Sequence, residues 1–356
     1  MNRDMEGKKR RKLIYVTDEQ PGYRRKKHGR GHVYFDMDGH KINKSVMVER
    51  LEKLPIPPMW DDVWICQKEN GHLQVTGFDE KGRKQYLYHP DWVTYRNANK
   101  FNKLIDFAKE LPSIRKRVQQ DLQQEEWTKE RVLALVVSVL DEAYIRIGNK
   151  AYLEENNTYG LTTLRRKHLK VEGEEAVFQY KAKSGKEREV NIDDKELVAL
   201  IRECSELPGY EIFRYRENGK GKAVDSEDVN DYLHEIAGEE FSSKDFRTWG
   251  GTVSAVEELE AALAEAEEYP RKKLMSTLVQ RVADRLGNTP AVCREYYIHP
   301  AILEAAEDGR LEQAVKRSRA EKKDEYDLDK HEKIALRLLK EYSREHEIKP
   351  VLKGQK

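Results

Sequence analysis

Cysteine is scarce in this sequence, with only three among 356 residues. Cys66, Cys204 and Cys293 lie far apart and form no Cys-x-x-Cys pair. This spacing argues against a disulfide framework and against a structural zinc site, and it suits a reducing cytoplasm. We therefore expect a fold that needs neither disulfides nor a bound metal.

Long apolar runs and a phosphate-binding loop are also missing. No stretch approaches the roughly 18 consecutive apolar residues of a membrane span, and no apolar segment of a secretion signal follows the basic N-terminus. The string closest to a loop for ATP phosphates, Ser184-Gly185-Lys186-Glu187, lacks the upstream glycine and the hydroxyl residue of that motif. We expect a soluble, cytoplasmic protein that does not enter a membrane and uses no ATP.

A strong net charge is absent as well, because 66 Lys and Arg residues nearly balance 65 Asp and Glu residues. The charge is nonetheless unevenly distributed: residues 8–12 and 24–27 are basic, whereas residues 257–268 carry a block of acids. A protein that is balanced on average can still present one basic face to phosphates. Residues 8–12, taken alone, are better explained by a solvated tail.

The hydrophobic pattern changes in the first third of the chain. Residues 33–89 are β-like, with two short segments, 72–78 and 83–89, on either side of a turn signal that ends in glycine. After Pro90 the pattern becomes helical, and residues 95–100 are typical of a connector between domains.

The remainder predicts a mostly helical domain with one small β-hairpin. Residues 131–145 are apolar nearly all round, which predicts a buried helix. Residues 177–180 and 188–192 bracket a turn with Ser184-Gly185 at its tip. Residues 254–268 predict a helix from propensity alone.

Together these patterns predict an α+β protein of three parts. We expect a β-rich N-terminal domain with a basic tail in residues 1–95 and a mostly helical domain in residues 96–303. Residues 304–356 are expected to form a charged helical extension without an evident core of its own.

Eight short strings carry a family resemblance. Five lie in the second domain: Arg146-Ile-Gly-Asn149, Tyr180-Lys-Ala-Lys183, Lys244-Asp-Phe-Arg-Thr-Trp-Gly250, Gly287-Asn-Thr-Pro290 and Tyr297-Ile-His-Pro300. Three lie in the first: Ile56-Pro-Pro-Met-Trp60, Val63-Trp-Ile-Cys66 and Gly82-Arg-Lys-Gln-Tyr86. In this order and spacing they resemble the poxvirus-like bacterial branch of the type IB DNA topoisomerases, along nearly the whole chain.

The resemblance implies an activity and a catalytic domain of the topoisomerase IB and tyrosine recombinase type. Such an enzyme cuts one strand of duplex DNA through a tyrosine, holds the end as a 3′-phosphotyrosine, lets the other end rotate, and reseals the strand. It relaxes supercoils of either sign without ATP, a metal or another cofactor.

The family's nucleophile corresponds to Tyr297. A phenol with an ordinary pKa near 10 is a poor nucleophile at neutral pH, so its surroundings must favour loss of the proton. Tyr296 is the immediate competitor. Tyr297 matches the family string Tyr-Ile-His-Pro, and it stands nine residues after Asn288 as that motif requires.

Arg146 and Arg247 match the two family arginines. Phosphoryl transfer adds charge to the non-bridging oxygens, and planar guanidinium groups answer that charge with paired donors. Ordinary structural explanations exist for both. Arg146 could be a solvated arginine beside a helix cap at Gly148-Asn149, and Arg247 could form a salt bridge with Asp245 or another nearby acid.

Lys183 matches the family's proton donor to the departing 5′ oxygen, a task that a lysine on a hairpin can perform. Lys181 and Lys186 compete for this role, and a solvated basic turn would explain all three.

Asn288 stands where viral family members have histidine. Since an asparagine cannot act as an acid or base near neutral pH, it would donate a hydrogen bond to a phosphate oxygen. The same segment also fits the start of a helix.

The resemblance also implies a grip on double-stranded DNA. A two-stranded ribbon fits the major groove, and we expect contacts from Arg83, Lys84, Gln85, Tyr86 and Tyr88. Tyr86 and Tyr88 should share one face of a strand, opposite Arg83 and Gln85. An amphipathic edge strand with aromatics in the core is the simpler alternative.

In the second domain, the resemblance implies that Lys244 and Tyr152 contact phosphates. Two domains on a short connector suggest a monomer that closes around DNA as a clamp, and we expect it at the nucleoid.

Two other functions fit part of these observations. A tyrosine recombinase shares the arginines, lysine and tyrosine, but normally carries a helical N-terminal DNA-binding domain, whereas residues 33–89 are β-rich. A non-catalytic DNA-binding protein of the same fold is the second alternative, and intact matches at every catalytic position argue against it.

Overall fold

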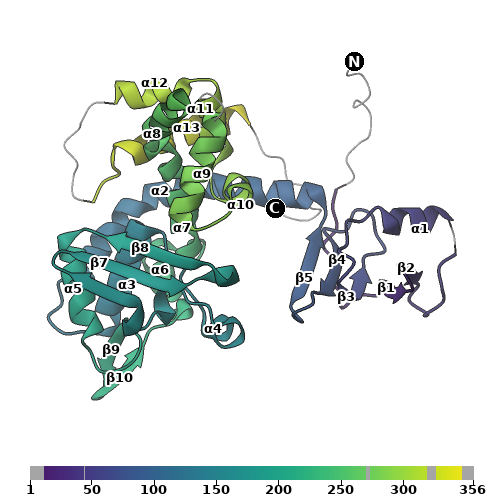
Figure 1. Ribbon diagram of the computed structural model, residues 1–356, viewed down its shortest axis with the longest axis horizontal. Coiled ribbons are helices and arrows are strands. Elements are labelled where there is room, and N and C mark those ends of the chain that lie inside the picture. The colour runs from purple at the N-terminus through teal and green to yellow at the C-terminus, as the bar shows by residue number, and fades with distance from the viewer. Residues whose placement is uncertain (1–11, 44, 270–272, 319–325, 347–356) are drawn as a thin grey trace. The chain divides into compact units, whose positions relative to one another are not determined.

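The computed structural model describes residues 12–43, 45–269, 273–318 and 326–346. These residues form two compact units, which divide between Lys100 and Phe101 (Figure 1). Of the helices in the described part of the chain, none combines the length and apolarity that a membrane crossing requires.

The first unit is built on a five-stranded antiparallel sheet with the order β2-β1-β3-β4-β5. Helix α1 (Ser45–Glu52) packs its Leu51 onto the sheet, in a core with Val63, Ile65 and Val75. The strands are β1 (Tyr23–His28), β2 (Gly31–Phe35), β3 (Asp61–Ile65), β4 (Leu73–Phe78) and β5 (Lys84–Tyr88).

The predicted pair of strands around residues 79–82 is confirmed. Strands β4 and β5 pair antiparallel, and Gly77 lies opposite Gln85. Asp79 closes the turn, because its Oδ1 accepts from the backbone N–H groups of Lys81 and Arg83, each at 3.0 Å. Gly82 adopts a φ of 70°, which explains the glycine at the end of the turn signal.

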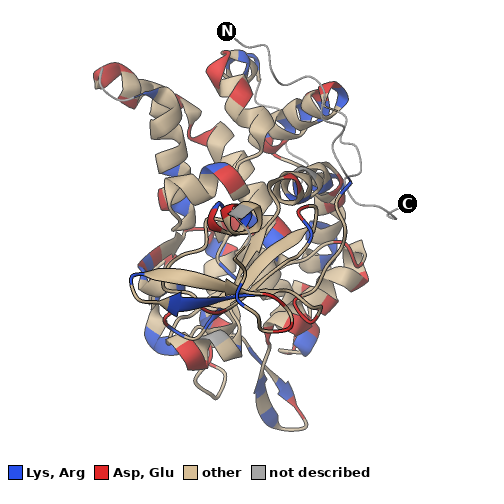
Figure 2. Cartoon of the chain, turned by 90° about the vertical axis from the view of Figure 1, so that its right-hand side faces the viewer, with Lys and Arg blue, Asp and Glu red and all other residues tan. Residues whose placement is uncertain are grey.

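Strand β1 and helix α1 were not expected from the sequence. Charge obscured β1, whose four consecutive basic residues make it almost wholly blue in Figure 2. Arg25, however, is buried, and its guanidinium donates to the carbonyls of Ile56, Pro57 and Trp60. A buried arginine with these partners is part of the core and not of a tail.

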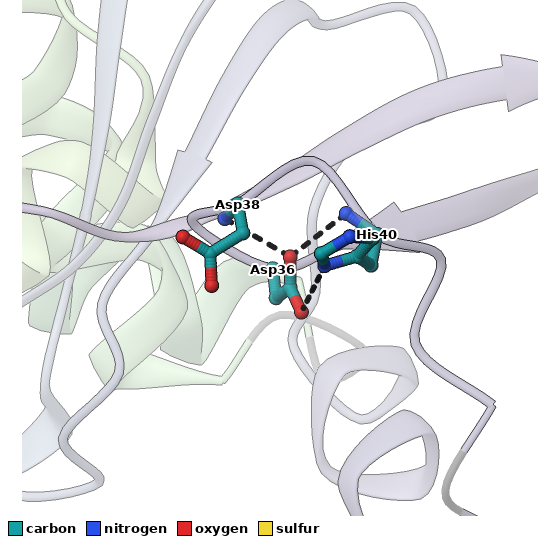
Figure 3. A group of neighbouring side chains, drawn as sticks. All are labelled: Asp36, Asp38 and His40. Carbon is teal, nitrogen blue, oxygen red and sulfur yellow. Dashed lines mark hydrogen bonds and ion pairs between the residues drawn. The ribbon is translucent and has the colours of Figure 1, made fainter.

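The turn after β2 is organised by Asp36. Its carboxylate accepts from the backbone N–H groups of Asp38 at 3.0 Å and His40 at 2.8 Å (Figure 3). The ring of His40 lies 3.7 Å from the same carboxylate. This is an aspartate turn, in which the side chain replaces a backbone acceptor.

Helix α2 (Pro90–Leu122) is a single helix of 33 residues. Residues 95–100, interpreted from the sequence as a connector, lie inside it, so the connection is helical and not an extended linker. The asparagines at 97 and 99 lower helix propensity, but the helix continues through them.

The second unit is mostly helical, and α3 lies among its other elements, as Figure 1 shows. The predicted buried helix is confirmed there. Its helices are α3 (Lys129–Ala143), α4 (Lys150–Asn156), α5 (Lys195–Ser205), α6 (Ser226–Ala237), α7 (Ser243–Glu257), α8 (Leu259–Glu268), α9 (Leu274–Leu286), α10 (Pro290–Tyr296), α11 (Pro300–Glu307), α12 (Arg310–Arg317) and α13 (Lys330–Glu345).

Two small sheets accompany these helices. One has the order β6-β7-β8 and the other pairs β9 with β10. The predicted hairpin is confirmed as β7 and β8, which pair antiparallel from Ala176 opposite Ile192 to Lys181 opposite Glu187. The strands are β6 (Leu169–Glu172), β7 (Glu175–Lys181), β8 (Glu187–Ile192), β9 (Arg214–Glu217) and β10 (Lys220–Ala223), with short 3₁₀ turns at Leu161–Thr163, Arg166–His168 and Lys183–Gly185.

The C-terminal part differs from the sequence expectation in two respects. The helix expected at residues 254–268 is broken at Glu258, which ends α7 and begins α8, so that Leu259 and Ala262 are buried. Residues after 304 also contribute to the core of the second unit, through buried residues such as Leu311 of α12 and Leu339 of α13.

Candidate active site

Arg146 lies in the loop between α3 and α4. Helix α3 ends at Ala143, and the next residue, Tyr144, caps it in a left-handed conformation with a φ of 52°. Asn149 is not part of a C-terminal cap, as one interpretation of the sequence had it, but caps the start of α4 by accepting from the N–H of Ala151. Backbone bonds fix the loop: the carbonyls of Arg146 and Ile147 each accept from a following segment at 2.8 Å.

Arg247 comes from α7 and is 5% exposed. Its guanidinium donates to the carbonyls of Tyr144 and Leu286 and lies 5.2 Å from the ring centre of Tyr297. The alternative ion pair with Asp245 is absent from the described residues, because Asp245 binds Lys103 at 2.9 Å and caps α7. Burial, together with the charge of Arg146, lowers the pKa of Arg247 to about 10.

Tyr297 follows directly on α10 and lies against α7. The hydroxyl of Thr252 donates to the Tyr297 carbonyl at 3.2 Å. A Cβ at Gly251 would stand 2.8 Å from that carbonyl oxygen, so only glycine permits this approach. Tyr296 is 37% exposed, and a hydrogen bond with Glu295 raises its pKa. The structure therefore brings Tyr297 to Arg247, while Tyr296 binds its own neighbour.

Asn288 stands in the turn between α9 and α10. Its backbone N–H donates to Ala283 at 2.9 Å, and Thr289 is the residue that caps α10. The side-chain Oδ1 of Asn288 accepts from Arg146. The structure thus joins Arg146, Asn288, Arg247 and Tyr297, which come from four separate segments of the chain.

Two N–H donors in this group are buried and without a hydrogen-bond partner among the described residues: Nε of Arg247 and Nδ2 of Asn288. The Asn288 side chain also meets the thiol of Cys293, which is a weak acceptor. An unsatisfied buried donor costs about 1–3 kcal/mol, and such groups need an explanation. Beside two guanidinium groups, these donors suit an anion with several oxygens.

The hairpin places the three candidate lysines differently. Lys183 is exposed at the turn, next to Ser184 and Gly185 with φ of 67° and 76°, and makes no hydrogen bond among the described residues. Lys186 donates to the Asn288 carbonyl at 3.3 Å. Lys181 is exposed at the end of β7. Of the three, Lys186 is the one engaged with the arginine and asparagine group.

The two expected phosphate contacts, Lys244 and Tyr152, belong to helices α7 and α4. Lys244 is exposed in the first turn of α7. Tyr152 belongs to α4, but its side chain lies outside the described residues.

The expected DNA-contacting residues of the first unit lie on and before the edge strand β5. Tyr86 and Tyr88 share one face as predicted, with stacked rings 6.1 Å apart, and Tyr86 is 48% exposed. On the other face, Arg83 and Gln85 both donate to Asp79, at 2.8 and 3.0 Å.

Lys84 belongs to the face of the two tyrosines. Its ammonium lies 5.7 Å from the ring centre of Tyr86 and pairs with Asp18 at 2.6 Å.

Two groups of the described residues could geometrically hold a metal ion. In the first, Asp36, Asp38 and His40, the Asp36 carboxylate already serves the turn of Figure 3. In the second, Asp329 caps α13 and Glu257 pairs with Arg285. Both groups have structural explanations.

Arg188 was missed by the sequence reasoning. Its guanidinium donates to the carbonyls of Asp284 and Arg285, at the end of α9. The strand alternation places Arg188 opposite Tyr180, but no local pattern shows which helix end a hairpin arginine will meet.

The chain resembles known proteins along most of its length. Residues 84–326 match the catalytic core of eukaryotic DNA topoisomerase I, and residues 31–79 match the N-terminal domain of bacterial DNA topoisomerase IB. DNA topoisomerase 1B of Acanthamoeba polyphaga mimivirus is 31% identical over 291 residues, which cover 80% of this chain and 87% of that protein.

Other similarities are weaker. DNA topoisomerase 1B of Vaccinia virus (strain Copenhagen) is 24% identical over 266 residues, which cover 73% of this chain and 82% of that protein. Among solved structures, the XerH site-specific recombinase bound to palindromic difH substrate aligns with a TM-score of 0.33 and 17% identity, over 59% of this chain and 51% of that one. Since the catalytic-core match alone spans more than half of the sequence, the chain belongs to the type IB DNA topoisomerases.

Proposed function

We propose that this topoisomerase relaxes positive and negative supercoils by cutting one DNA strand through Tyr297 and resealing it after rotation, without ATP or a metal ion. The observation that carries the assignment to this site is the pair of unsatisfied buried donors, Nε of Arg247 and Nδ2 of Asn288. They lie in the group that joins Arg146 to Asn288 and Arg247 to the ring of Tyr297. A phosphodiester would supply the missing acceptors.

The proposed reaction has one covalent intermediate. The phenolic oxygen of Tyr297 forms a bond to the scissile phosphorus, and the bond from phosphorus to the 5′ oxygen breaks. Tyr297 gives its hydroxyl proton to solvent water, and the departing 5′ oxygen takes a proton from Lys183. Religation reverses these steps, so the phosphotyrosine conserves the bond that ATP would otherwise be needed to remake.

In this proposal the two arginines stabilise the negative charge of the transition state. Charge develops on the non-bridging oxygens, and the guanidinium groups of Arg146 and Arg247 are held in fixed positions before the substrate arrives. A fixed pair of cations can stabilise this charge, as metal ions do in other phosphoryl-transfer enzymes.

DNA is the substrate of the proposed reaction, and the grip is divided between the units. We assign contacts with the duplex to Arg83, Lys84, Gln85, Tyr86 and Tyr88 of the first unit, and phosphate contacts to Lys244 and Tyr152 of the second. The exposed ring of Tyr86 beside Lys84 supports this assignment. We further propose that one copy of the chain closes around DNA as a clamp, and that it works at the nucleoid.

Covalent capture tests the proposal. A duplex whose cut end diffuses away traps the phosphotyrosine, and peptide mapping then identifies the attached residue. Attachment at Tyr297 is expected, whereas attachment at another tyrosine would refute the assignment. Relaxation of supercoiled plasmid in EDTA without ATP separates the alternatives, because a recombinase scarcely relaxes DNA that lacks its sites.

A further inference from the structure

The end of helix α9 is held by arginines from other parts of the second unit. An α-helix leaves its last four carbonyls without intrahelical partners. The two terminal nitrogens of Arg188 donate to the carbonyls of Asp284 and Arg285, at 2.9 and 2.7 Å. Arg247 donates to the next carbonyl, that of Leu286. A positive charge at this helix end is also favoured by the helix dipole.

The stem of Arg188 fits against the residue that ends α9. Gly287 adopts a left-handed conformation with a φ of 61°. A Cβ at Gly287 would stand 2.6 Å from Cδ of Arg188, so the arginine occupies the space that a side chain would fill. The contact therefore depends on shape as well as on hydrogen bonds.

On the hairpin, Arg188 is tied to Tyr180. The two residues are directly opposite in the pairing of β7 and β8. Tyr180 is 5% exposed, and its phenol forms a side-chain hydrogen bond with Arg188. A second tie joins the hairpin to the same turn, because Lys186 donates to the Asn288 carbonyl at 3.3 Å.

We propose that Arg188 is a positioning residue that fixes the hairpin bearing Lys183 to the α9–α10 turn bearing Asn288. This inference rests on the proposed function, in which Lys183 is the proton donor. Lys183 itself makes no hydrogen bond among the described residues. Its placement relative to the scissile phosphate therefore depends on the hairpin, which Arg188 fixes with two hydrogen bonds and Lys186 with one.

The geometry argues against Arg188 as a third phosphate ligand. Each of its terminal nitrogens already donates to a helix carbonyl, and these carbonyls partly offset its charge. Arg247, by contrast, keeps Nε without a partner among the described residues.

The test compares two leaving groups in single-turnover cleavage. A 5′-sulfur leaving group needs no proton donor, because a thiol has a much lower pKa than an alcohol. We expect Arg188→Ala to slow cleavage of the ordinary substrate on the order of 10- to 100-fold, as a small misplacement of a catalytic group does. With the sulfur substrate the loss should largely disappear. Equal losses on both substrates, or no loss on either, would overturn the inference.

Two further variants make the comparison sharp. Arg202→Ala is the matched control, because Arg202 also donates to a carbonyl, that of Gly173 at the other end of β7, far in the fold from the turn of Lys183. It should cleave both substrates at the normal rate. Arg188→Lys serves if the alanine variant does not fold. It keeps the charge but cannot reach two carbonyls with a planar fork, so it should show a smaller loss of the same selectivity.

A separate readout distinguishes failure of this inference from failure of the proposed function. If Lys183→Ala is not rescued by the sulfur substrate, Lys183 is not the proton donor. The positioning role is then judged from amide hydrogen exchange in the intact free protein. Faster exchange of residues 182–187 in Arg188→Ala than in the natural enzyme supports it, and unchanged exchange refutes it.

Discussion

At the scale of single residues, the first question is which hydroxyl attacks DNA. Tyr297→Phe removes one oxygen but keeps the ring beneath Arg247. We therefore expect cleavage to be abolished, while binding to duplex DNA stays close to normal. Plasmid relaxation and a gel-shift measurement on the same samples check both parts. Tyr296→Phe is the matched control and should relax plasmid normally; the reverse pattern would show that the wrong tyrosine had been assigned.

Asn288 supplies a second prediction at this scale. Replacing it with alanine removes the buried Nδ2 donor and the acceptor of Arg146. The cleavage rate should fall on the order of 10²-fold, as when an oxyanion-hole donor is lost. Asn288→His should remain active, because a neutral imidazole offers an N–H to the same oxygen.

Thr289→Ser is the control for Asn288, since it preserves the cap of α10 beside an unchanged asparagine. Rapid-quench cleavage assays compare the three variants. An alanine variant that cleaves at the natural rate would reduce Asn288 to a residue of the turn.

At the scale of elements, His299 makes the stability of α11 depend on pH. Its Nδ1 accepts from the N–H of Ala301, and its ring packs between Phe101 and Tyr342. Burial lowers the pKa of His299 to about 3. In the unfolded chain the ring titrates near its ordinary value of 6.5, so between these pH values the unfolded state binds one proton more. Stability therefore falls as the pH falls below 6.5, by about 2 kcal/mol between pH 7 and pH 5.

His299→Asn removes this titration and keeps an acceptor suited to a helix N-terminus. Urea unfolding followed by circular dichroism should show that the variant is less stable at pH 7, but loses less stability on going to pH 5. His234→Asn, on the partly exposed α6, should keep the natural pH dependence. An equal loss in all three proteins would mean that His299 does not titrate as its burial implies.

Elements with strong local signals could be predicted from the sequence. The run at residues 131–145 and the hairpin around Ser184-Gly185 carry their own periodicity and turn residues, and both are present. Strand β1 was not predicted because its four consecutive basic residues show no alternation of apolar and polar side chains, whereas in the fold Arg25 donates to carbonyls from residues 56–60. Because these partners lie about thirty residues away in the chain, the sequence around Arg25 contains no signal of them.

In the candidate site, too, single residues could be predicted from the sequence, whereas the contacts between them could not. The strings around Arg146, Asn288 and Tyr297 indicated residues whose chemistry is recognisable one at a time. Their meeting, and the role of Arg188, depend on how α9 ends against a hairpin about 96 residues earlier in the chain. Tertiary packing decides such contacts, and spacing in the sequence does not.

At the scale of the whole molecule, one buried charge joins distant helices of the second unit. Glu332 of α13 is 3% exposed and accepts from Arg115 of α2 at 2.8 Å and from the indole N–H of Trp249 of α7 at 3.0 Å. Arg115 in turn binds Asp141 of α3 at 2.7 Å. Trp249 stands two residues after Arg247, so α13 supports the helix that carries Arg247.

Removing Glu332 should therefore destabilise the fold strongly. Glu332→Ala leaves the half-buried Arg115 beside a single carboxylate and removes the acceptor of the buried Trp249. Because breaking a buried charge pair costs about 3–5 kcal/mol, the loss should approach the lower end of that range. Chemical unfolding followed by tryptophan fluorescence measures the loss. Glu341→Ala is the control on the same helix, because Glu341 is partly exposed and pairs only loosely with Arg337, at 3.9 Å; its effect should stay below about 1 kcal/mol. If the two variants were equally stable, the buried network would not hold α13 to α7, and the support of Arg247 would have to come from its own carbonyl partners alone.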